Sequence, residues 1–261
     1  MPTPTTPNLL LKQRHSLIQQ RLLAEGRVLA LDLAEQLNVS EDTIRRDLRD
    51  LAAAGLCTRV YGGALPLPPT PGTLAERRGE APDRKWRLAQ AAANLVQADM
   101  VLFIDAGSTN LAIAEALPDL PLTVATNAPA IALALLERPR IEVILIGGRI
   151  DRGAGASLGA KTLRDAELIR SDLCFLGACG VDAEAGITAF SYEEAEFKRA
   201  IAVMSKAVVV AATSEKLATA APFSMLPAAH LSHLVVEHDA AAAQLAAFSQ
   251  LGVQILRARP L

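Results

Sequence analysis

The stretch LAEQLNVSEDTIRRDLRDLAAAGLCTRVYGGA, residues 33–64, predicts two helices with a tight turn between them and a short hairpin after them. Apolar residues at helical spacing form an inward stripe on each helix: Leu33, Ala34, Leu37, Ile44, Leu48 and Leu51. Asn38 and Val39 interrupt the first helix, and Ser40 is a good N-cap residue for the second. Gly55 ends the second helix. The stretch is therefore expected to form two packed helices followed by a short hairpin.

The second helix exposes basic residues on its outer face. At about 100° per residue, Arg46 and Arg49 point away from the apolar stripe, with Thr43 and Arg45 at its flanks. A recognition helix enters the major groove of DNA in this way, because arginine reaches guanine edges or phosphates and threonine contacts thymine methyl groups or phosphates. In the hairpin, we expect Arg59 and Tyr61 to touch the DNA backbone beside the groove.

The same alternation of arginine and aspartate is also typical of a solvated helix face. In that alternative, Asp47 and Asp50 neutralise Arg46 and Arg49. Charge does not decide between the two, because residues 1–63 contain eight Lys or Arg and seven Asp or Glu.

The string of residues itself resembles the DNA-binding signature of the DeoR family of bacterial regulators. In that family a helix-turn-helix with a T-I-R-R-D-L core precedes a basic wing that ends in G-G-A, and the match here covers nearly all of residues 14–64 without a gap. The resemblance implies that Ser40 contacts phosphate as well as capping the helix. The predicted DNA-binding residues are Ser40, Thr43, Arg45, Arg46, Arg49, Arg59 and Tyr61.

A proline-rich segment separates this module from the rest of the chain. Residues 65–73, LPLPPTPGT, contain four prolines and a glycine, which predicts an extended linker. Beyond it, short apolar runs such as VLFID, LTVAT and AVVVA alternate with helical patterns, which predicts a mainly parallel sheet covered on both faces. We therefore expect an α/β protein with a winged helix-turn-helix domain at 8–64, a linker at 65–83 and an α/β domain at 84–261.

Glycines and small polar residues follow directly after several predicted strands. The carboxyl ends of strands in an open parallel sheet face one crevice, where ligands bind. The Gly107-Ser108-Thr109 turn at a helix N-terminus is suited to phosphate, although it is also typical of a simple N-cap, and Lys198 can simply pair with Glu194. The predicted effector-binding residues are Asp105, Gly107, Ser108, Thr109, Thr126, Asn127, Gly147, Gly148, Arg149, Lys198 and Lys216.

Residues 75–258 also resemble the DeoR-family sensor domain, whose fold is related to ribose-5-phosphate isomerase and which binds sugar phosphates. The matching motifs are D-A-G-S-T at 105–109, Thr126-Asn127, Gly147-Gly148, residues 177–182 and the stretch from Glu193 to Lys198. Many members have Asp-Ser-Ser-Lys where this chain has Thr213-Ser214-Glu215-Lys216. The lysine is kept and the aspartate is not, which leaves open which sugar hydroxyls are recognised.

Composition sets the remaining bounds. The chain has 261 residues and a net charge of −2, so any binding of nucleic acid depends on local charge. Three cysteines without C-x-x-C spacing argue against a disulfide scaffold or a zinc site, and we expect no metal and no cofactor. Neither a signal peptide nor a membrane span is expected, which predicts a cytoplasmic protein.

Together these features predict a repressor of carbohydrate genes that binds an operator in double-stranded DNA as a homo-oligomer, dimer or tetramer, and is released by a phosphorylated sugar or polyol. The alternative is an isomerase-like enzyme with an appended DNA-binding module, in which Asp105, Asp182 or Glu194 serves as the base. We expect no catalytic activity, because a DNA-binding module fills the first quarter of the chain. A pure assembly protein would need neither the helix arginines nor the strand-end glycines.

Overall fold

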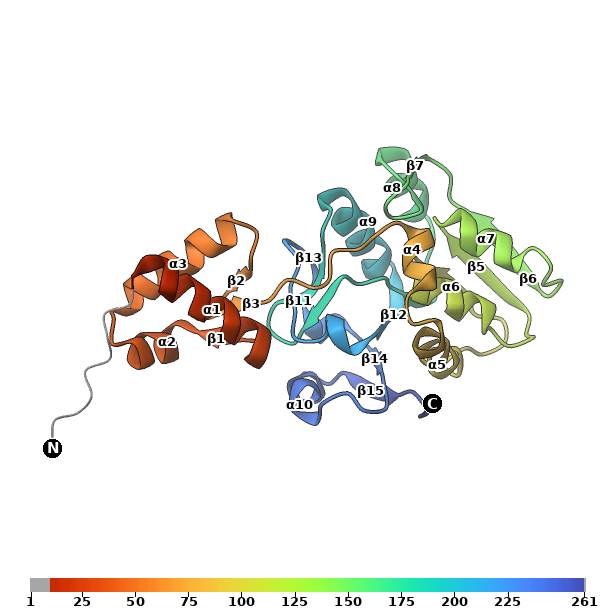
Figure 1. The fold of residues 1–261 in the computed structure, drawn as a ribbon. Coiled ribbons are helices and arrows are strands. Elements are labelled where there is room, and N and C mark those ends of the chain that lie inside the picture. Colours follow the sequence, from red (N-terminus) through yellow and green to blue (C-terminus); the bar gives the residue numbers. More distant parts are fainter. Residues whose placement is uncertain (1–9, 261) are drawn as a thin grey trace, which may run out of the picture.

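The computed structural model describes residues 10–260 and has two parts joined by an extended segment (Figure 1). Residues 8, 9 and 261 of the predicted domain bounds lie outside the described residues. In the described part no helix is both long and apolar enough to cross a membrane. The N-terminal part contains α1 (Leu11–Glu25), β1 (Val28–Leu29), α2 (Ala30–Leu37), α3 (Glu41–Ala53), β2 (Thr58–Val60) and β3 (Gly63–Leu65).

The predicted helix-turn-helix is present at α2 and α3. Asn38 ends α2 in the left-handed conformation, with a φ of 50°, and the Ser40 hydroxyl caps α3 by accepting a hydrogen bond from the Thr43 amide. The predicted apolar stripes are buried together with Ile18 and Leu22 of α1, which forms the third wall of this core. The three strands pair antiparallel in the order β1-β3-β2, so the hairpin packs onto the helices as a wing.

A buried ion pair ties α1 to α3. The Arg14 guanidinium donates from Nε and Nη2 to the two carboxylate oxygens of Asp47, whose side chain is 2 % exposed. His15 Nε2 lies 3.3 Å from the same carboxylate. Because these partners are 33 residues apart, the pair fixes where α1 lies against the recognition helix.

The connecting segment is only partly extended. Residues 66–73 have no regular structure, but the predicted linker also contains the last residue of β3 and a short helix, α4 (Leu74–Gly79). A capping box between Thr73 and Glu76 starts α4. The prediction of a linker rests on its prolines and does not include this local helix signal. The next helix, α5 (Pro82–Ala93), begins two residues before the predicted start of the α/β domain at 84, with its proline in the first turn.

The second part is built on a seven-stranded sheet in which every neighbouring pair is parallel. The strand order is β15 (Gln254–Arg257), β14 (His233–Val236), β12 (Ser205–Ala212), β9 (Ser171–Phe175), β4 (Val101–Ile104), β5 (Leu122–Thr126) and β6 (Ile141–Leu145). The chain begins the sheet at β4 and adds β5 and then β6 on one side of it. It then returns to place β9 on the other side of β4, and β12, β14 and β15 follow outward from there. The order therefore reverses between β4 and β9, which is where open parallel sheets bind ligands.

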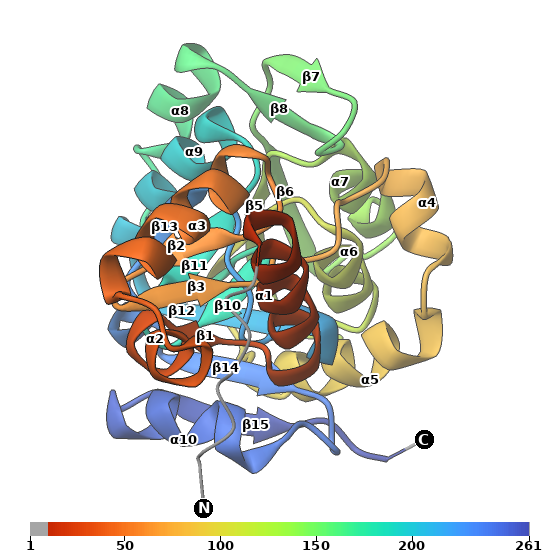
Figure 2. The ribbon, with the colours of Figure 1, turned by 60° about the vertical axis from the view of Figure 1, so that its left-hand side comes forward.

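Helices cover both faces of this sheet (Figure 2). One layer contains α5, α6 (Ser108–Glu115) and α7 (Pro129–Leu135), and the other contains α8 (Ala160–Ala166), α9 (Tyr192–Val203) and α10 (Ala242–Gln250). Alternate strand residues enter the two cores: Leu102 and Ile104 of β4 pack in the first, and Phe103 packs in the second. The alternation explains why these strands are continuously apolar in the sequence. The predicted mainly parallel α/β architecture is confirmed.

Two smaller sheets were not predicted. A hairpin pairs β7 (Arg149–Asp151) with β8 (Ala156–Leu158), and an antiparallel sheet contains β10 (Gly180–Asp182), β11 (Gly186–Ala189) and β13 (Phe223–Leu226). The second small sheet and the loop before β13 meet the N-terminal part. Arg27 donates to Asp182 at 2.9 Å, and the Thr58 hydroxyl donates to the Ala220 carbonyl at 2.6 Å.

We expect Asp47→Ala to destabilise the N-terminal domain by about 3 kcal/mol, because it leaves the largely buried Arg14 guanidinium without its carboxylate. Native-state hydrogen exchange of the α1 and α3 amides measures this domain's own free energy of unfolding. The matched control is Asp50→Ala on the exposed face of α3, expected to change that free energy by less than ~0.5 kcal/mol. Equal effects of the two substitutions would contradict the importance of the buried pair.

Candidate functional site

The outer face of α3 presents three arginines to solvent. Arg45, Arg46 and Arg49 are exposed, and Arg45 pairs with Glu41 one turn earlier at 2.8 Å. Within residues 10–260, neither Arg46 nor Arg49 forms an ion pair with a carboxylate. Asp47 does not neutralise this face, because it points inward to Arg14. Asp50 is exposed on α3, and within the described residues it forms no ion pair with Arg46 or Arg49.

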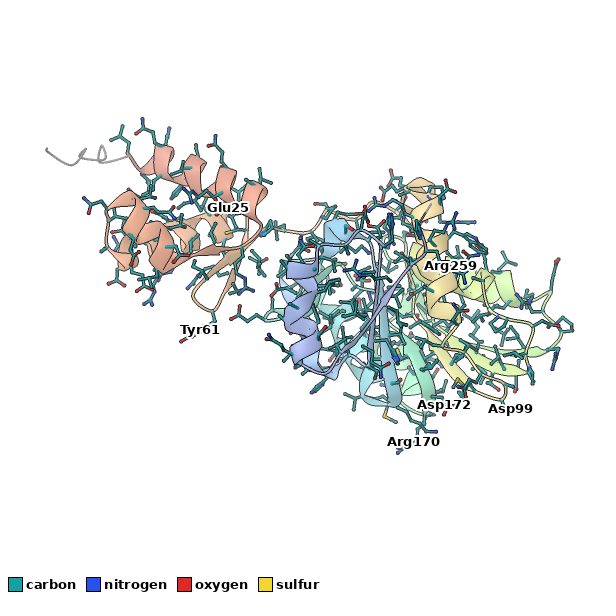
Figure 3. All side chains as sticks on the ribbon, turned by 90° about the horizontal axis from the view of Figure 1, so that it is seen from below. Glu25, Tyr61, Asp99, Arg170, Asp172 and Arg259 are labelled. Atoms are coloured by element: carbon teal, nitrogen blue, oxygen red, sulfur yellow. The ribbon has the colours of Figure 1, made fainter. Side chains whose placement is uncertain are left out.

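The wing extends this face. Tyr61, at the turn between β2 and β3, is 91 % exposed and stands at the tip of the wing (Figure 3), and Arg59 is exposed on β2. Gly62 adopts a φ of 73° in this turn, a conformation that favours glycine. At the other end of the face, the Ser40 and Thr43 hydroxyls lie 2.8 Å apart at the start of α3. The structure thus brings the predicted DNA-binding residues onto α3 and the wing.

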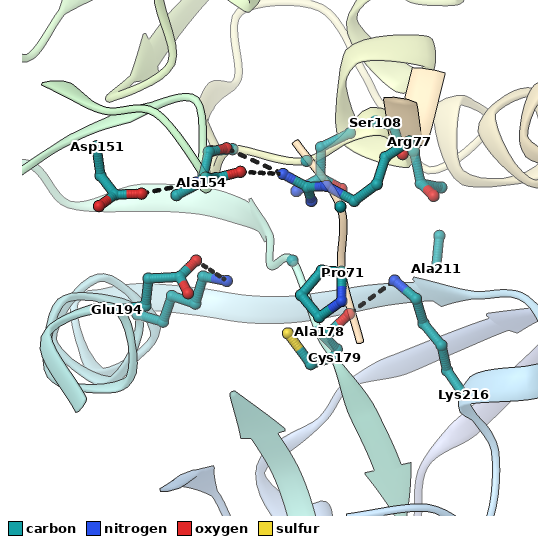
Figure 4. A pocket seen from close by; sticks show the side chains of 18 residues that line it. Pro71, Arg77, Ser108, Asp151, Ala154, Ala178, Cys179, Glu194, Ala211 and Lys216 are labelled. Atoms are coloured by element: carbon teal, nitrogen blue, oxygen red, sulfur yellow. Dashed lines mark hydrogen bonds and ion pairs between the residues drawn. The ribbon is translucent and has the colours of Figure 1, made fainter. Parts of the chain in front are cut away.

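A cavity lies at the carboxyl ends of β4, β9 and β12, at the reversal of strand order (Figure 4). Its volume is about 160 Å³, roughly ten times the ~10–15 Å³ that one water molecule requires. Six segments form its wall: residues 71, 72 and 77; 106–110; 151, 153 and 154; 177–179; 194 and 198; and 211 and 216.

The N-terminus of α6 forms one side of this cavity. Gly107 adopts a φ of 148° before the helix, and within the described residues neither the Ser108 nor the Thr109 hydroxyl has a hydrogen-bond partner. These groups therefore do not cap the helix, and the amides of its first turn face the cavity side with the positive end of the helix dipole. Asn110 anchors the turn, because its side-chain amide donates to the carbonyls of Asp105 and Phe175 on adjacent strand ends. The turn has the geometry of an anion site.

Two lysines face the same cavity: Lys198 is buried and Lys216 is half-buried. Lys198 Nζ lies 3.3 Å from Glu194 Oε1 and 3.6 Å from Asp105 Oδ2, and Lys216 Nζ donates to the Ala178 carbonyl at 2.8 Å. Burial by itself lowers the pKa of Lys198, but the carboxylates of Asp105 and Glu194 outweigh burial and raise it. Burial lowers the pKa of Lys216 to about 8. Burial also raises the pKa of Asp105, against the opposing effect of Lys198.

Comparison with known proteins agrees with this arrangement. The profile of the DeoR C terminal sensor domain matches residues 80–238, and that of the DeoR-like helix-turn-helix domain matches residues 14–68. The chain belongs to the DeoR family. The predicted membership is confirmed.

Relatives in this DeoR family are named as regulators. The glycerol-3-phosphate regulon repressor of Escherichia coli K12 is 33 % identical over 82 % of this chain and 85 % of its own length. The putative aga operon transcriptional repressor of Escherichia coli O157:H7 is 27 % identical over 94 % and 93 %. Among solved structures, ribose 5-phosphate isomerase A from Methanocaldococcus jannaschii has a TM-score of 0.39, with 15 % identity over 52 % of this chain and 54 % of that one. The predicted function, a transcriptional regulator and not an enzyme, is confirmed by the relatives.

Some of the predicted effector-binding residues line this cavity, and others lie outside its wall. Gly107, Ser108, Thr109, Lys198 and Lys216 line it, and Asp105 lies beneath it. The residues after β5 and β6 are outside the wall: Thr126, Asn127, Gly147, Gly148 and Arg149.

Each of the excluded residues has another partner or position. The Thr126 hydroxyl accepts from the Ala128 amide, and the Asn127 amide group donates to the Ser157 carbonyl. Gly147 accepts from the Thr162 hydroxyl, and exposed Arg149 pairs with Glu193 at 2.7 Å. Gly148 packs so closely against Thr162 that a Cβ there would lie 2.0 Å from its hydroxyl. These five residues support the loops beside the cavity.

Sequence reasoning missed residues that reach the cavity from outside the strand ends. They are Arg77 of α4 and Asp151 at the end of β7. The strand-end rule examines only turns after parallel strands, so it has no means of finding a linker helix or a small hairpin. Asp182, one of the bases considered for an isomerase, lies outside the cavity wall and pairs with Arg27.

We expect Lys216 to titrate near pH 8, because burial disfavours its ammonium form and no carboxylate within the described residues pairs with it. The measurement is the pH dependence of the lysine Cε resonances in selectively labelled protein, with Lys216 assigned by its loss in Lys216→Gln. Lys198 serves as the internal control, since the Asp105 and Glu194 carboxylates raise its pKa above the ordinary lysine value. A Lys216 midpoint at the ordinary value of a solvated lysine would contradict the buried position of its amine.

Proposed function

We propose that this DeoR-family chain binds an operator in double-stranded DNA, represses carbohydrate-metabolism genes inside the cell, and is released by a phosphorylated sugar or polyol. The observation that carries the proposal is the pairing of two features in one chain. One is an exposed helix-turn-helix face with two arginines that have no carboxylate partner within the described residues. The other is a cavity lined by Lys198 and Lys216 beside an uncapped helix N-terminus.

On the DNA side, α3 enters the major groove. Arg46 and Arg49 reach base edges or phosphates from its middle turns, while Thr43 and Arg45 contact the groove wall from its first turn. Ser40 contacts phosphate beside the helix N-terminus, and Arg59 and Tyr61 of the wing hold the backbone next to the groove.

On the effector side, the phosphate binds at the first turn of α6. Ser108, Thr109 and the backbone amides donate to its oxygens, and Lys216 supplies positive charge. Lys198 is paired with Asp105 and Glu194, and it positions these two carboxylates at the cavity. The carboxylates of Glu194 and Asp151 are placed to accept hydrogen bonds from sugar hydroxyls.

Two chain segments lead from the cavity to the DNA-binding domain. Residues 177–179 line the cavity and continue into β10, where Asp182 pairs with Arg27. Residues 216–220 begin at the cavity lysine and end at Ala220, which bonds to Thr58 and, through its amide, to the Pro66 carbonyl. An effector that shifts either segment changes the orientation of the DNA-binding domain, to the extent that it prefers the DNA-free arrangement.

Repression also requires more than one DNA-binding domain, because helix-turn-helix proteins bind half-sites about one helical turn apart. We propose a homo-oligomer, dimer or tetramer, formed by the α/β domains. Supporting this, exposed apolar side chains gather on α7 and on the edge strand β6: Leu133, Leu136, Ile144 and Leu145.

DNA selected by this protein from a random-sequence pool provides the operator for testing. We expect Arg46→Ala to weaken its binding by about 1–3 kcal/mol, measured by fluorescence anisotropy at fixed salt. The matched control is Arg170→Ala, which removes the same charge from the amino-terminal end of the sheet, far from the wing (Figure 3). Equal losses in the two variants, or no loss in Arg46→Ala, would count against a groove-binding α3.

We expect Arg27→Ala to keep the affinity for a phosphorylated sugar but to reduce its effect on operator binding severalfold, because the link to Asp182 is lost. Calorimetry gives the sugar affinity, and anisotropy with and without the sugar gives the coupling. Arg21→Ala is the control, because Arg21 pairs with Glu25 on its own helix. Full coupling in Arg27→Ala would exclude this contact as the route.

A further inference from the structure

The linker forms part of the cavity wall. Pro71, Gly72 and Arg77 line it, although they lie between the two domains in the sequence. Contacts hold α4 in this place: Leu74 packs against Gly155, where an added Cβ would lie 2.6 Å from a Leu74 methyl carbon, and α4 contacts α6. The segment that joins the DNA-binding domain to the sheet therefore passes over the ligand cavity.

One nitrogen of the Arg77 guanidinium is bonded and another has no partner within the described residues. Its Nη2 donates to the carbonyls of Gly153 at 2.8 Å and Ala154 at 3.3 Å. Its Nε is buried and has no hydrogen-bond partner within residues 10–260. A buried donor without an acceptor is costly and uncommon, so this N–H is placed for an acceptor that the protein itself does not supply.

Arg77, like Lys216, is a cation of the wall that no carboxylate balances within the described residues. Lys198 is balanced by two carboxylates, whereas Arg77 has no ion-pair partner in the described part of the chain. Lys85 reinforces this side, since its ammonium donates to the Arg77 carbonyl from beneath. A guanidinium keeps its charge at any physiological pH, and its planar fork matches the oxygens of a phosphate.

We infer that Arg77 binds the phosphate of the effector directly, opposite the first turn of α6, so that the linker helix α4 is itself part of the binding site. The inference rests on the proposed effector class and adds a residue that binds the effector's phosphate. A phosphate shared by Arg77 and Ser108, which both line the cavity (Figure 4), bridges α4 to α6. Because Nη2 stays on Gly153 and Ala154, binding adds a contact to the linker and tightens it against the α/β domain.

The test compares Arg77→Ala and Arg77→Gln with wild type, using calorimetry with glycerol 3-phosphate, ribose 5-phosphate and inorganic phosphate as probes. Arg78→Ala, an exposed neighbour on the same helix, is the matched control. We expect both Arg77 variants to bind the wild type's best probe about ten to a hundred times more weakly, as loss of a charged hydrogen bond implies, and Arg78→Ala to bind it normally. Operator affinity without probe should be the same in all four proteins, which separates effector binding from a structural role of the linker.

Wild-type affinity for the probe in either Arg77 variant overturns the inference. So does a loss of operator binding without probe in a variant that remains folded by circular dichroism, because Arg77 would then act only as a structural residue. If one variant fails to fold, the other decides. If wild type itself binds none of the three probes, the proposed effector class fails, a result distinct from unchanged binding in the variants.

Discussion

Parallel pairing of β4, β9 and β12 is the constraint on which the rest of this structure depends. It brings three carboxyl ends to one edge of the sheet, and with them the Gly107 turn, residues 177–179 and Lys216. None of these segments is a ligand site alone, since a glycine turn at a helix N-terminus is common. Together they enclose a cavity with buried positive charge at the reversal of strand order. The segments that form this cavity are also the ones that continue into contacts with the DNA-binding domain.

This shared use of segments gives a physical basis for coupling two distant sites. The DNA-binding domain contacts the α/β domain at residues that follow cavity residues by three or four positions in the chain: the Asp182 carboxylate after Cys179, and the Ala220 carbonyl after Lys216. The linker adds a third connection through α4. Such short connections need no long pathway of packed residues, because a displacement at the cavity wall is carried by the backbone itself.

Much of the fold was predictable, because it depends on local periodicity. The stripe of Ile44, Leu48 and Leu51 predicted which face of the recognition helix is exposed, and the apolar runs VLFID, LTVAT and AVVVA predicted β4, β5 and β12. The strand-end rule found the Gly107 turn and placed Thr126, Asn127 and residues 147–149 in the same site, because strand order is not visible in the sequence. Arg77 and the pair of Arg14 with Asp47 depend on contacts between distant segments, and no local pattern encodes them.

The most direct test of the account is a titration of the wild-type protein on its operator with the phosphorylated sugar that binds it best, followed by anisotropy at constant ionic strength. The account predicts that operator affinity falls by about tenfold or more at saturation, the range of ordinary allosteric coupling. Constant ionic strength is essential, since salt alone weakens contacts with DNA phosphates. An operator affinity that stays the same while the cavity is fully occupied would contradict the account.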